Sequence, residues 1–227
     1  MQQNEHSELI EIHMGSEVKY KKFFVAPRVQ RVSGSKTFLF IKRAFDIVAS
    51  LFAMILLALP MAIIAVCIKL DSPGTILYRQ ERLGKNGKPI KVLKFRSMHM
   101  DAEKNGAQWA SSEDPRTTRI GSFLRKCRLD ELPQLYCIFI GDMTLVGPRP
   151  ERDIFYDEFA KYIDGFEQRL LVTPGLTGLA QVRGGYDLDP EEKVVYDIEY
   201  IENRSLAMDL KILFETVAVI FNHDGAR

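Results

Sequence analysis

The chain has 227 residues, of which 46% are hydrophobic and 27% charged, and its formal net charge is +1. This length fits one domain with appendages better than two full domains, and the balanced charge gives no general reason to expect a nucleic-acid partner. The three cysteines, Cys67, Cys127 and Cys137, lack C-x-x-C spacing and are odd in number, which favours a reducing compartment over a disulfide framework.

The first 35 residues mix charged, small and apolar side chains without a sustained period. We expect an N-terminal tail or arm over residues 1–35 and assign it no chemistry. The start of the sequence is polar and acidic and shows no signal-peptide pattern, so we expect the globular part to be cytosolic.

An uncharged apolar segment follows, from Ile47 to Ile68, which is long enough to cross a bilayer. A buried core helix is the alternative. Within about thirty residues on either side of the segment there are eight basic residues, so charge gives no preferred orientation. Pro60 lies inside the segment, and the residues alone leave open a kinked spanning helix and a re-entrant helix broken at Leu59–Pro60.

Beyond the apolar segment, Asn86-Gly87 predicts a type I′ turn joining strands from Thr75 to Gln80 and from Ile90 to Phe95. Helical segments are expected over residues 121–128, 132–140, 151–160, 190–202 and 206–221. The expected fold class is therefore α+β, mainly helical with a small β-hairpin, with a membrane helix over residues 36–70 and a cytosolic domain over residues 71–227. The last helix carries an apolar face that either lies on a membrane surface or packs on the protein's own core; this face consists of Leu206, Leu210, Leu213, Phe214, Val217 and Phe221.

Two adjacent carboxylates, Asp130 and Glu131, follow a basic stretch that contains Arg125. Taken alone, Asp130 is as readily explained as the N-cap of a helix whose first turn contains Pro133. The functional alternative is that one carboxylate attacks phosphorus and the other binds Mg²⁺, a cation that prefers oxygen ligands. The neighbouring cations would then offset the negative charge of a phosphate.

Several further cations have a similar ambiguity. Arg149 lies between Pro148 and Pro150, which restrict the backbone around it, although an ordinary turn with a solvated arginine explains the same residues. Lys94 and Arg96 at the end of the predicted hairpin could bind phosphate or simply face solvent.

Taken together, these motifs resemble the bacterial sugar transferases that are monotopic phosphoglycosyl transferases, and the resemblance runs from about Lys42 to Phe221. The stretches that carry it are Lys42-Arg43 with Phe45-Asp46, residues 94–98, 114–116, 119–121 and 129–135, Gly141 to Pro150, residues 174–178 and residues 180–182. Cys127-Arg128, Tyr136-Cys137 and Leu179 depart from the family pattern, so we assign no sugar by analogy.

The resemblance implies a ping-pong transfer of a sugar 1-phosphate from a UDP-sugar to undecaprenyl phosphate, with release of UMP, at the start of exopolysaccharide, capsule or glycan synthesis. It makes Asp130 the nucleophile and Glu131 the Mg²⁺ ligand, and it assigns Arg125 and Arg149 to phosphate. Lys94, Arg96 and Gln181 complete the expected substrate-binding set. The family also implies a re-entrant helix broken at Pro60, at the cytoplasmic face of the bacterial inner membrane and in contact with its lipid. Nucleic acid is not an expected partner, and a homodimer is left open.

Two other classes of function fit parts of the pattern. A membrane-tethered scaffold would use the same residues as caps and turns and would show no turnover. A metal-dependent phosphatase acting on isoprenoid phosphates would use the same acids and arginines with water as acceptor.

Overall fold

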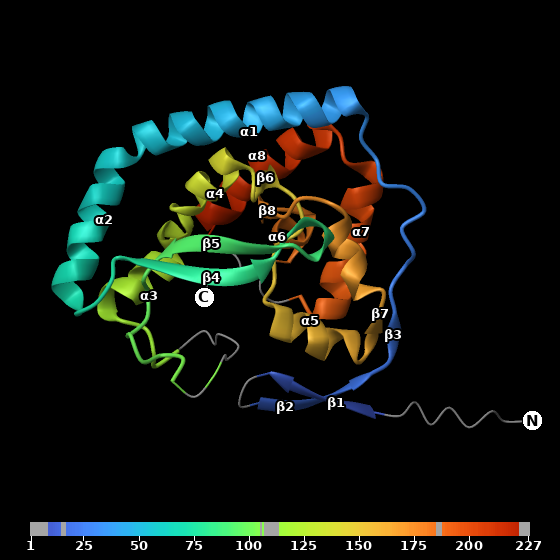
Figure 1. The fold of residues 1–227 in the computed structure, drawn as a ribbon, viewed down its shortest axis with the longest axis horizontal. Coiled ribbons are helices and arrows are strands. Elements are labelled where there is room, and N and C mark those ends of the chain that lie inside the picture. Colours follow the sequence, from blue (N-terminus) through green and yellow to red (C-terminus); the bar gives the residue numbers. More distant parts are fainter. Residues whose placement is uncertain (1–8, 15–16, 105, 107–113, 185–187, 223–227) are drawn as a thin grey trace, which may run out of the picture.

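The computed structural model describes residues 9–14, 17–104, 106, 114–184 and 188–222, and over these residues the fold is α+β, as expected (Figure 1). The strands are β1 (Leu9–Met14), β2 (Glu17–Lys22), β3 (Phe24–Val25), β4 (Leu77–Leu83), β5 (Pro89–Phe95), β6 (Thr144–Val146), β7 (Ile163–Asp164) and β8 (Gly175–Thr177). They pair into two-stranded sheets: β1–β2 and β4–β5 are antiparallel, and β3–β7 and β6–β8 are parallel.

Helices surround these small sheets. The α-helices are α1 (Lys36–Leu56), α2 (Ala58–Asp71), α3 (Arg119–Lys126), α4 (Gln134–Ile140), α5 (Asp153–Ala160), α6 (Leu179–Arg183), α7 (Pro190–Asn203) and α8 (Leu206–Asn222). Three short 3₁₀ segments in the described chain are η1 (Lys85–Gly87), η2 (Leu129–Glu131) and η3 (Phe166–Leu171). The predicted helices are therefore present, with ends shifted by a few residues.

The apolar segment forms two helices, α1 and α2, that meet at a bend of 61°. The break falls on Leu57 and not at Leu59–Pro60, where we had predicted it. Pro60 accounts for the shift, because a proline ring clashes with the carbonyl four residues earlier, here that of Leu56, and removes its hydrogen-bond donor. In the described chain no helix is by itself long and apolar enough to cross a bilayer, whereas α1 and α2 together meet both criteria.

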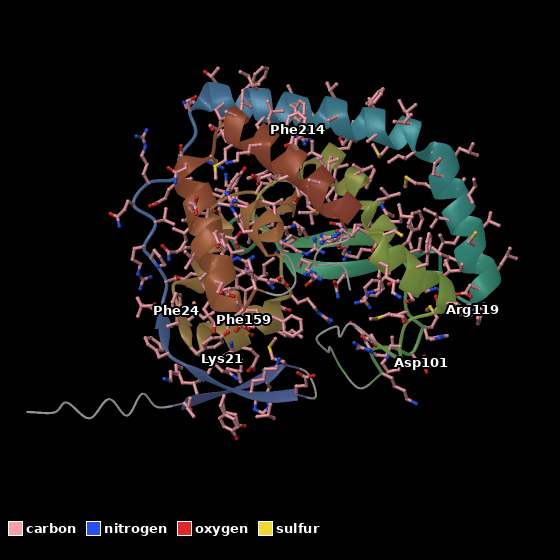
Figure 2. All side chains as sticks on the ribbon, turned by 180° about the vertical axis from the view of Figure 1, so that it is seen from behind. Lys21, Phe24, Asp101, Arg119, Phe159 and Phe214 are labelled. Atoms are coloured by element: carbon pink, nitrogen blue, oxygen red, sulfur yellow. The ribbon has the colours of Figure 1, made fainter. Side chains whose placement is uncertain are left out.

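The outer side of α1 and α2 is apolar and uncovered. In Figure 1, α1 runs along one edge of the molecule and α2 turns down beside it, and Figure 2 shows the outer side chains of both helices projecting away from the body. The large exposed apolar residues here include Phe40, Phe45, Val48, Phe52, Ile55, Leu56, Leu59, Ile63, Val66 and Leu70. Proteins surrounded by water rarely leave so large an apolar surface open.

The inner side of α1 is tied to the domain by charged residues. Arg43 donates to the carbonyls of Ile138 and Phe139 at 2.6 and 2.7 Å, which places a cation at the C-terminal end of α4. Lys42 pairs with Asp209 of α8 at 2.6 Å, and Asp46 accepts a hydrogen bond from Thr144 at 2.6 Å. These buried contacts fix α1 on α4, β6 and α8.

The final helix α8 exposes apolar residues while its inner side is buried. Leu206, Leu210, Phe214 and Val217 are exposed, whereas Ile212 is fully buried. In both views α8 lies next to α1 (Figures 1 and 2). The side chain of Phe221, which the sequence placed on the apolar face, lies outside the described residues. This helix therefore packs on the core through Ile212 and Leu213 and leaves other residues of the predicted apolar face exposed.

The N-terminal segment has more structure than a tail. β1 and β2 form an antiparallel hairpin in which Glu11 faces Tyr20, and β3 pairs with β7. Ile12 and Met14 are buried in a core cluster with Phe155 and Phe159 of α5. Our expectation missed the hairpin because only one of its strands has a buried face, so its alternation is weak.

The β4–β5 hairpin crosses the centre of the molecule (Figure 1). Asn86 and Gly87 have positive φ angles of 57° and 74°, as the predicted type I′ turn requires. The Lys88 N–H donates to the Lys85 carbonyl across that turn at 3.3 Å. Ile90 and Val92 of β5 are buried against α4, and this packing fixes the position of β5, the strand that carries Lys94, relative to α4.

Candidate active site

A sharp change of chain direction presents the two adjacent carboxylates. α3 is capped by Thr118, whose side chain accepts from the Gly121 N–H at 3.0 Å, and it ends at Lys126. Arg128 then adopts a left-handed conformation with φ 56° and ψ 18°. For a residue other than glycine this costs about 1–2 kcal/mol. The strained residue turns the chain from α3 into η2, the short segment that contains Asp130 and Glu131.

Asp130 does not cap the following helix. α4 begins after Pro133, which supplies no side-chain hydrogen bond to the helix. The carboxyl group of Asp130 is instead buried, with 7% of the residue exposed. The capping alternative therefore does not account for this residue.

Glu131 is held by two cations. Lys94 Nζ lies 2.9 Å from Glu131 Oε1, and the Arg149 guanidinium contacts both oxygens of the same carboxylate. Burial alone would raise the pKa of Glu131, but the charges and hydrogen bonds of Arg149 and Lys94 outweigh it and hold the pKa well below its usual range. Glu131 is thus a fixed anion.

Asp130 has the opposite electrostatic character. Burial raises the pKa of the Asp130 carboxyl to about 6, and the negative charge of Glu131 contributes to the increase. Lys94, Arg149 and Arg125 oppose it through their positive charges. Two adjacent acids with pKa values displaced in opposite directions are typical of sites where the two groups have different tasks.

These acids border a cavity of about 330 Å³ whose lining is strongly basic. The basic residues along it in the described chain are Arg82, Lys94, Arg96, Arg116, Arg125, Arg128, Arg149, Arg152, Arg169 and Lys193. The acids include Glu103, Glu151 and Asp197 besides the central pair. An excess of guanidinium groups around a buried carboxylate suits a ligand that brings several phosphate charges.

All seven predicted site residues other than Pro60 line this one cavity. They come from β5, the residue after it, α3, η2, the turn after β6 and α6. Gln181 uses its side-chain nitrogen to bond the Leu176 carbonyl at 2.9 Å, while its Oε1 is buried without a partner among the described residues. Pro60 lies apart from the cavity, in α2.

Arg96 is the residue whose contacts differ most from our expectation. Its guanidinium donates to the carbonyls of Pro73 and Ser72 at 2.5 and 2.7 Å and to the Ser72 hydroxyl at 2.9 Å. Ser72 and Pro73 directly follow α2, Arg96 also lies 3.4 Å from the carbonyl of Ile68 in the last turn of that helix, and Arg96 is 4% exposed. A cation that caps a helix end in this way joins α2 to the hairpin, so its geometry does not support the predicted phosphate contact.

Sequence reasoning missed several charged residues along the cavity. Arg82 pairs with Ile90 in the hairpin register and so shares a face with Lys94, which the alternation along β4 could have shown. Arg169 and Asp197 form a buried ion pair at 2.5 Å. Arg169 lies in η3, a segment without a clear period, and no local pattern marks it.

The protein side chains do not form a complete metal cage by themselves. In the described ranges of the chain there is no group of three or more His, Cys, Asp or Glu side chains placed to hold a metal ion. Mg²⁺ commonly uses one or two carboxylates together with substrate phosphates and water. Glu131 Oε2 is the less engaged oxygen of the pair, since its described contact is Arg149 at 3.3 Å. The residues therefore fit Mg²⁺ held jointly with a phosphate-bearing ligand.

Comparison with known proteins identifies the family of this chain. The model of the family described as "Bacterial sugar transferase" matches residues 37–223, which includes every residue of the predicted site. The chain belongs to the bacterial sugar transferase family. This match confirms the resemblance stated from the motifs.

Individual members of the family are similar to this chain over most of its length. It is 43% identical over 196 residues to a UDP-N-acetylgalactosamine-undecaprenyl-phosphate N-acetylgalactosaminephosphotransferase of Aeromonas hydrophila, covering 85% of this chain and 46% of the relative. A UDP-glucose:undecaprenyl-phosphate glucose-1-phosphate transferase of Escherichia coli is 42% identical, covering 78% of this chain and 39% of the relative. The exopolysaccharide production protein PSS of Rhizobium leguminosarum is 44% identical, covering 79% and 94%.

The chain thus spans less than half the length of the first two relatives and nearly all of the third. The names of the first two relatives specify different sugars. Relatives at this level of identity to the chain therefore differ in the sugar that their names specify.

Proposed function

We propose that this protein transfers a sugar 1-phosphate from a UDP-sugar to undecaprenyl phosphate. The observation that carries the proposal is the buried Asp130 beside a Glu131 that Lys94 and Arg149 hold ionised, in a cavity lined with arginines. Relatives named as undecaprenyl-phosphate sugar phosphotransferases support the same donor and acceptor.

Asp130 acts as the nucleophile in this proposal. A carboxylate oxygen attacks the β-phosphorus of the UDP-sugar, the bond from phosphorus to the bridging oxygen breaks, and UMP leaves with the electron pair. The phosphosugar is then joined to Asp130. A phosphate oxygen of the lipid attacks the same phosphorus in the second step, which releases the polyprenyl diphosphate sugar and restores the carboxylate.

The cations around Asp130 make this attack feasible. An anion that attacks a phosphate diester is repelled by its charge, and arginines placed before substrate binds reduce this repulsion without reorganisation. Arg125 and Arg149 face the donor phosphates, and Lys94 keeps Glu131 ionised. Glu131, together with a substrate phosphate, would hold Mg²⁺, and the ion would supply additional positive charge for the leaving UMP.

The apolar surface supports the proposal that a membrane lipid is the acceptor. The outer sides of α1, α2 and α8 expose large apolar residues, and Arg96 joins the end of α2 to the hairpin that carries Lys94. In the proposal the bent α1–α2 pair dips into the inner membrane and returns to the cytoplasmic face. This arrangement brings the phosphate of a membrane lipid to the same surface as Asp130.

The test is UMP release by the purified full chain in detergent or lipid, given undecaprenyl phosphate, Mg²⁺ and a panel of UDP-sugars. We expect UMP with at least one donor, and loss of release in Asp130→Asn. Turnover that persists at full rate in Asp130→Asn would remove the nucleophile assignment. Complete inactivity with every donor would favour the scaffold alternative, and inorganic phosphate or free sugar phosphate as product would favour the phosphatase.

Arg204→Lys is the matched control for these measurements. Arg204 donates to the Ser33 carbonyl at 2.5 Å and lies over the ring of Phe38, and it does not line the cavity. We expect this variant to release UMP at the wild-type rate. A similar loss in Asp130→Asn and in the control would point to general instability of the preparation.

A further inference from the structure

The turn that carries Arg149 is held at four successive backbone carbonyls. The carbonyl of Pro148 accepts from the Gly175 N–H at 2.9 Å, and that of Glu151 accepts from the Leu83 N–H at 3.0 Å. Between them, the carbonyls of Arg149 and Pro150 accept from arginine side chains. The donors come from three parts of the chain, namely β4, η3 and β8, so the turn is fixed from several sides.

Arg169 holds the first of the two inner carbonyls. Its Nη2 donates to the Arg149 carbonyl at 3.0 Å, while its Nε bonds Asp197 Oδ2 at 2.5 Å. The guanidinium carbon lies 4.8 Å from the centroid of the Phe166 ring, and the side chain is 2% exposed. An arginine fixed by a carboxylate and an aromatic ring has few alternative positions.

Arg82 holds the second inner carbonyl. Its Nη1 donates to the Pro150 carbonyl at 2.6 Å and lies 3.2 Å from Glu151 Oε2. Its Nε and Nη2 both donate to Gln80 Oε1, at 3.0 and 2.6 Å. Arg82 therefore connects the turn to β4, on the same hairpin face as Lys94.

The side chain of Arg149 leads from this turn to the chemical centre. Its guanidinium contacts both oxygens of Glu131. Glu131 directly follows Asp130 in the sequence. A shift of the turn would move Arg149 relative to Glu131 and to the phosphate it faces. Misplacement by about 1 Å at such a site can lower the rate by about a hundredfold.

We propose that Arg82 and Arg169 are positioning residues that act through the backbone of the Arg149 turn. Together they fix the carbonyls of Arg149 and Pro150 and so determine where the Arg149 guanidinium lies relative to Glu131. They form a clamp, by which we mean these two arginines and the two carbonyls they bond. The rate effect of the clamp rests on the proposed transfer reaction, whereas its effect on the turn does not.

The test uses lysine substitutions, which keep the buried positive charge but cannot bond a carbonyl and a carboxylate in the fork geometry of arginine. Arg169→Lys and Arg82→Lys are each combined with Arg149→Ala, and single-turnover UMP release is measured for the single and double variants. We expect each lysine variant alone to slow release by about tenfold. In the Arg149→Ala background the same substitution should change the rate by less than about twofold, because the guanidinium that the clamp positions is absent.

Equal losses with and without Arg149, or no loss in either single variant, would overturn the clamp. Arg204→Lys serves as control, since it also alters a bond to a carbonyl but lies outside the cavity, and its rate should match the wild type. If Arg169→Lys fails to fold because Asp197 is poorly paired, the comparison of Arg82→Lys with and without Arg149→Ala tests the clamp by the same criterion.

A second measurement separates the clamp from the proposed function. Amide hydrogen exchange over residues 144–153 is compared in wild type, Arg82→Lys, Arg169→Lys and Arg204→Lys. Faster exchange in the two clamp variants alone supports the clamp, even if no UDP-sugar releases UMP from the wild type and the proposed function fails. Exchange identical to the wild type in both clamp variants would overturn it, whatever the activity.

Discussion

Replacing Asp130 by Asn should abolish transfer and stabilise the folded protein. Burial raises the pKa of the Asp130 carboxyl from its ordinary value of 3.8 to about 6. Below pH 3.8 the carboxyl is protonated in both the folded and the unfolded chain, so it has no effect on stability. Above pH 6 it is ionised in both, and the folded state then bears a cost of about 3 kcal/mol. Asn removes that cost.

The stabilisation should therefore depend on pH in a defined way. It should be largest above pH 6, decrease as the pH falls from about 6 towards 4, and vanish below 4. For a chain of this size about 3 kcal/mol corresponds to an increase in melting temperature of roughly 6–12 °C, which we take as a ceiling. Thermal unfolding of wild type and Asp130→Asn in the same detergent, from pH 4 to pH 8, measures the difference.

Asp114→Asn is the control with the opposite sign. Its hydrogen bonds from Arg116 lower the pKa of the Asp114 carboxyl, so removing the charge should destabilise the protein at neutral pH. An Asp130→Asn protein that melts at or below the wild-type temperature at pH 7.5 would refute the burial argument. So would a stabilisation that does not change between pH 8 and pH 4.

Three other predictions follow from the same contacts. The kcat/KM for UMP release should fall about tenfold per pH unit below about pH 6, because protonation removes the Asp130 nucleophile. A flat profile of kcat/KM down to pH 4.5 would contradict this. Lys42→Met should lower unfolding stability by about 3 kcal/mol or more in thermal or denaturant melts, since it leaves Asp209 buried without its cation, whereas the exposed Lys211→Met should have little effect. Single cysteines at Lys36 and Lys85, in a chain lacking the native cysteines, should both react with a membrane-impermeant thiol reagent from the cytoplasmic side; labelling from opposite sides would indicate a spanning helix.

The parts of the fold that were predictable are those set by local chemistry. Asn86-Gly87 specified the turn of the central hairpin because these residues accept positive φ angles. The helix expected from residue 190 begins there as α7, where the structure shows a capping box of Asp189 and Glu192 with Pro190 in the first turn. The break between α1 and α2 was predicted from Pro60, although a proline acts one turn upstream and the bend falls at Leu57.

What the sequence could not provide were contacts between distant segments. Arg96 was expected to face phosphate, but the turn after α2 lies against it and accepts hydrogen bonds from its Nη1 and Nη2. Arg169 belongs to no motif, yet it reaches the Arg149 turn twenty residues upstream. Different roles for Asp130 and Glu131 were expected from the family resemblance. The electrostatic difference between them depends on the fold, because Glu131 contacts both Lys94 and Arg149.

The central claim is that Asp130 carries the phosphosugar between donor and acceptor, and an experiment without acceptor tests it most directly. The purified protein is incubated with Mg²⁺ and a UDP-sugar that supports turnover, with no lipid phosphate present. We predict a burst of about one UMP per active protein molecule, and a phosphosugar adduct on the peptide that contains Asp130. UMP release that begins only when undecaprenyl phosphate is added, with no adduct at any time, would contradict the account and indicate direct transfer from donor to lipid.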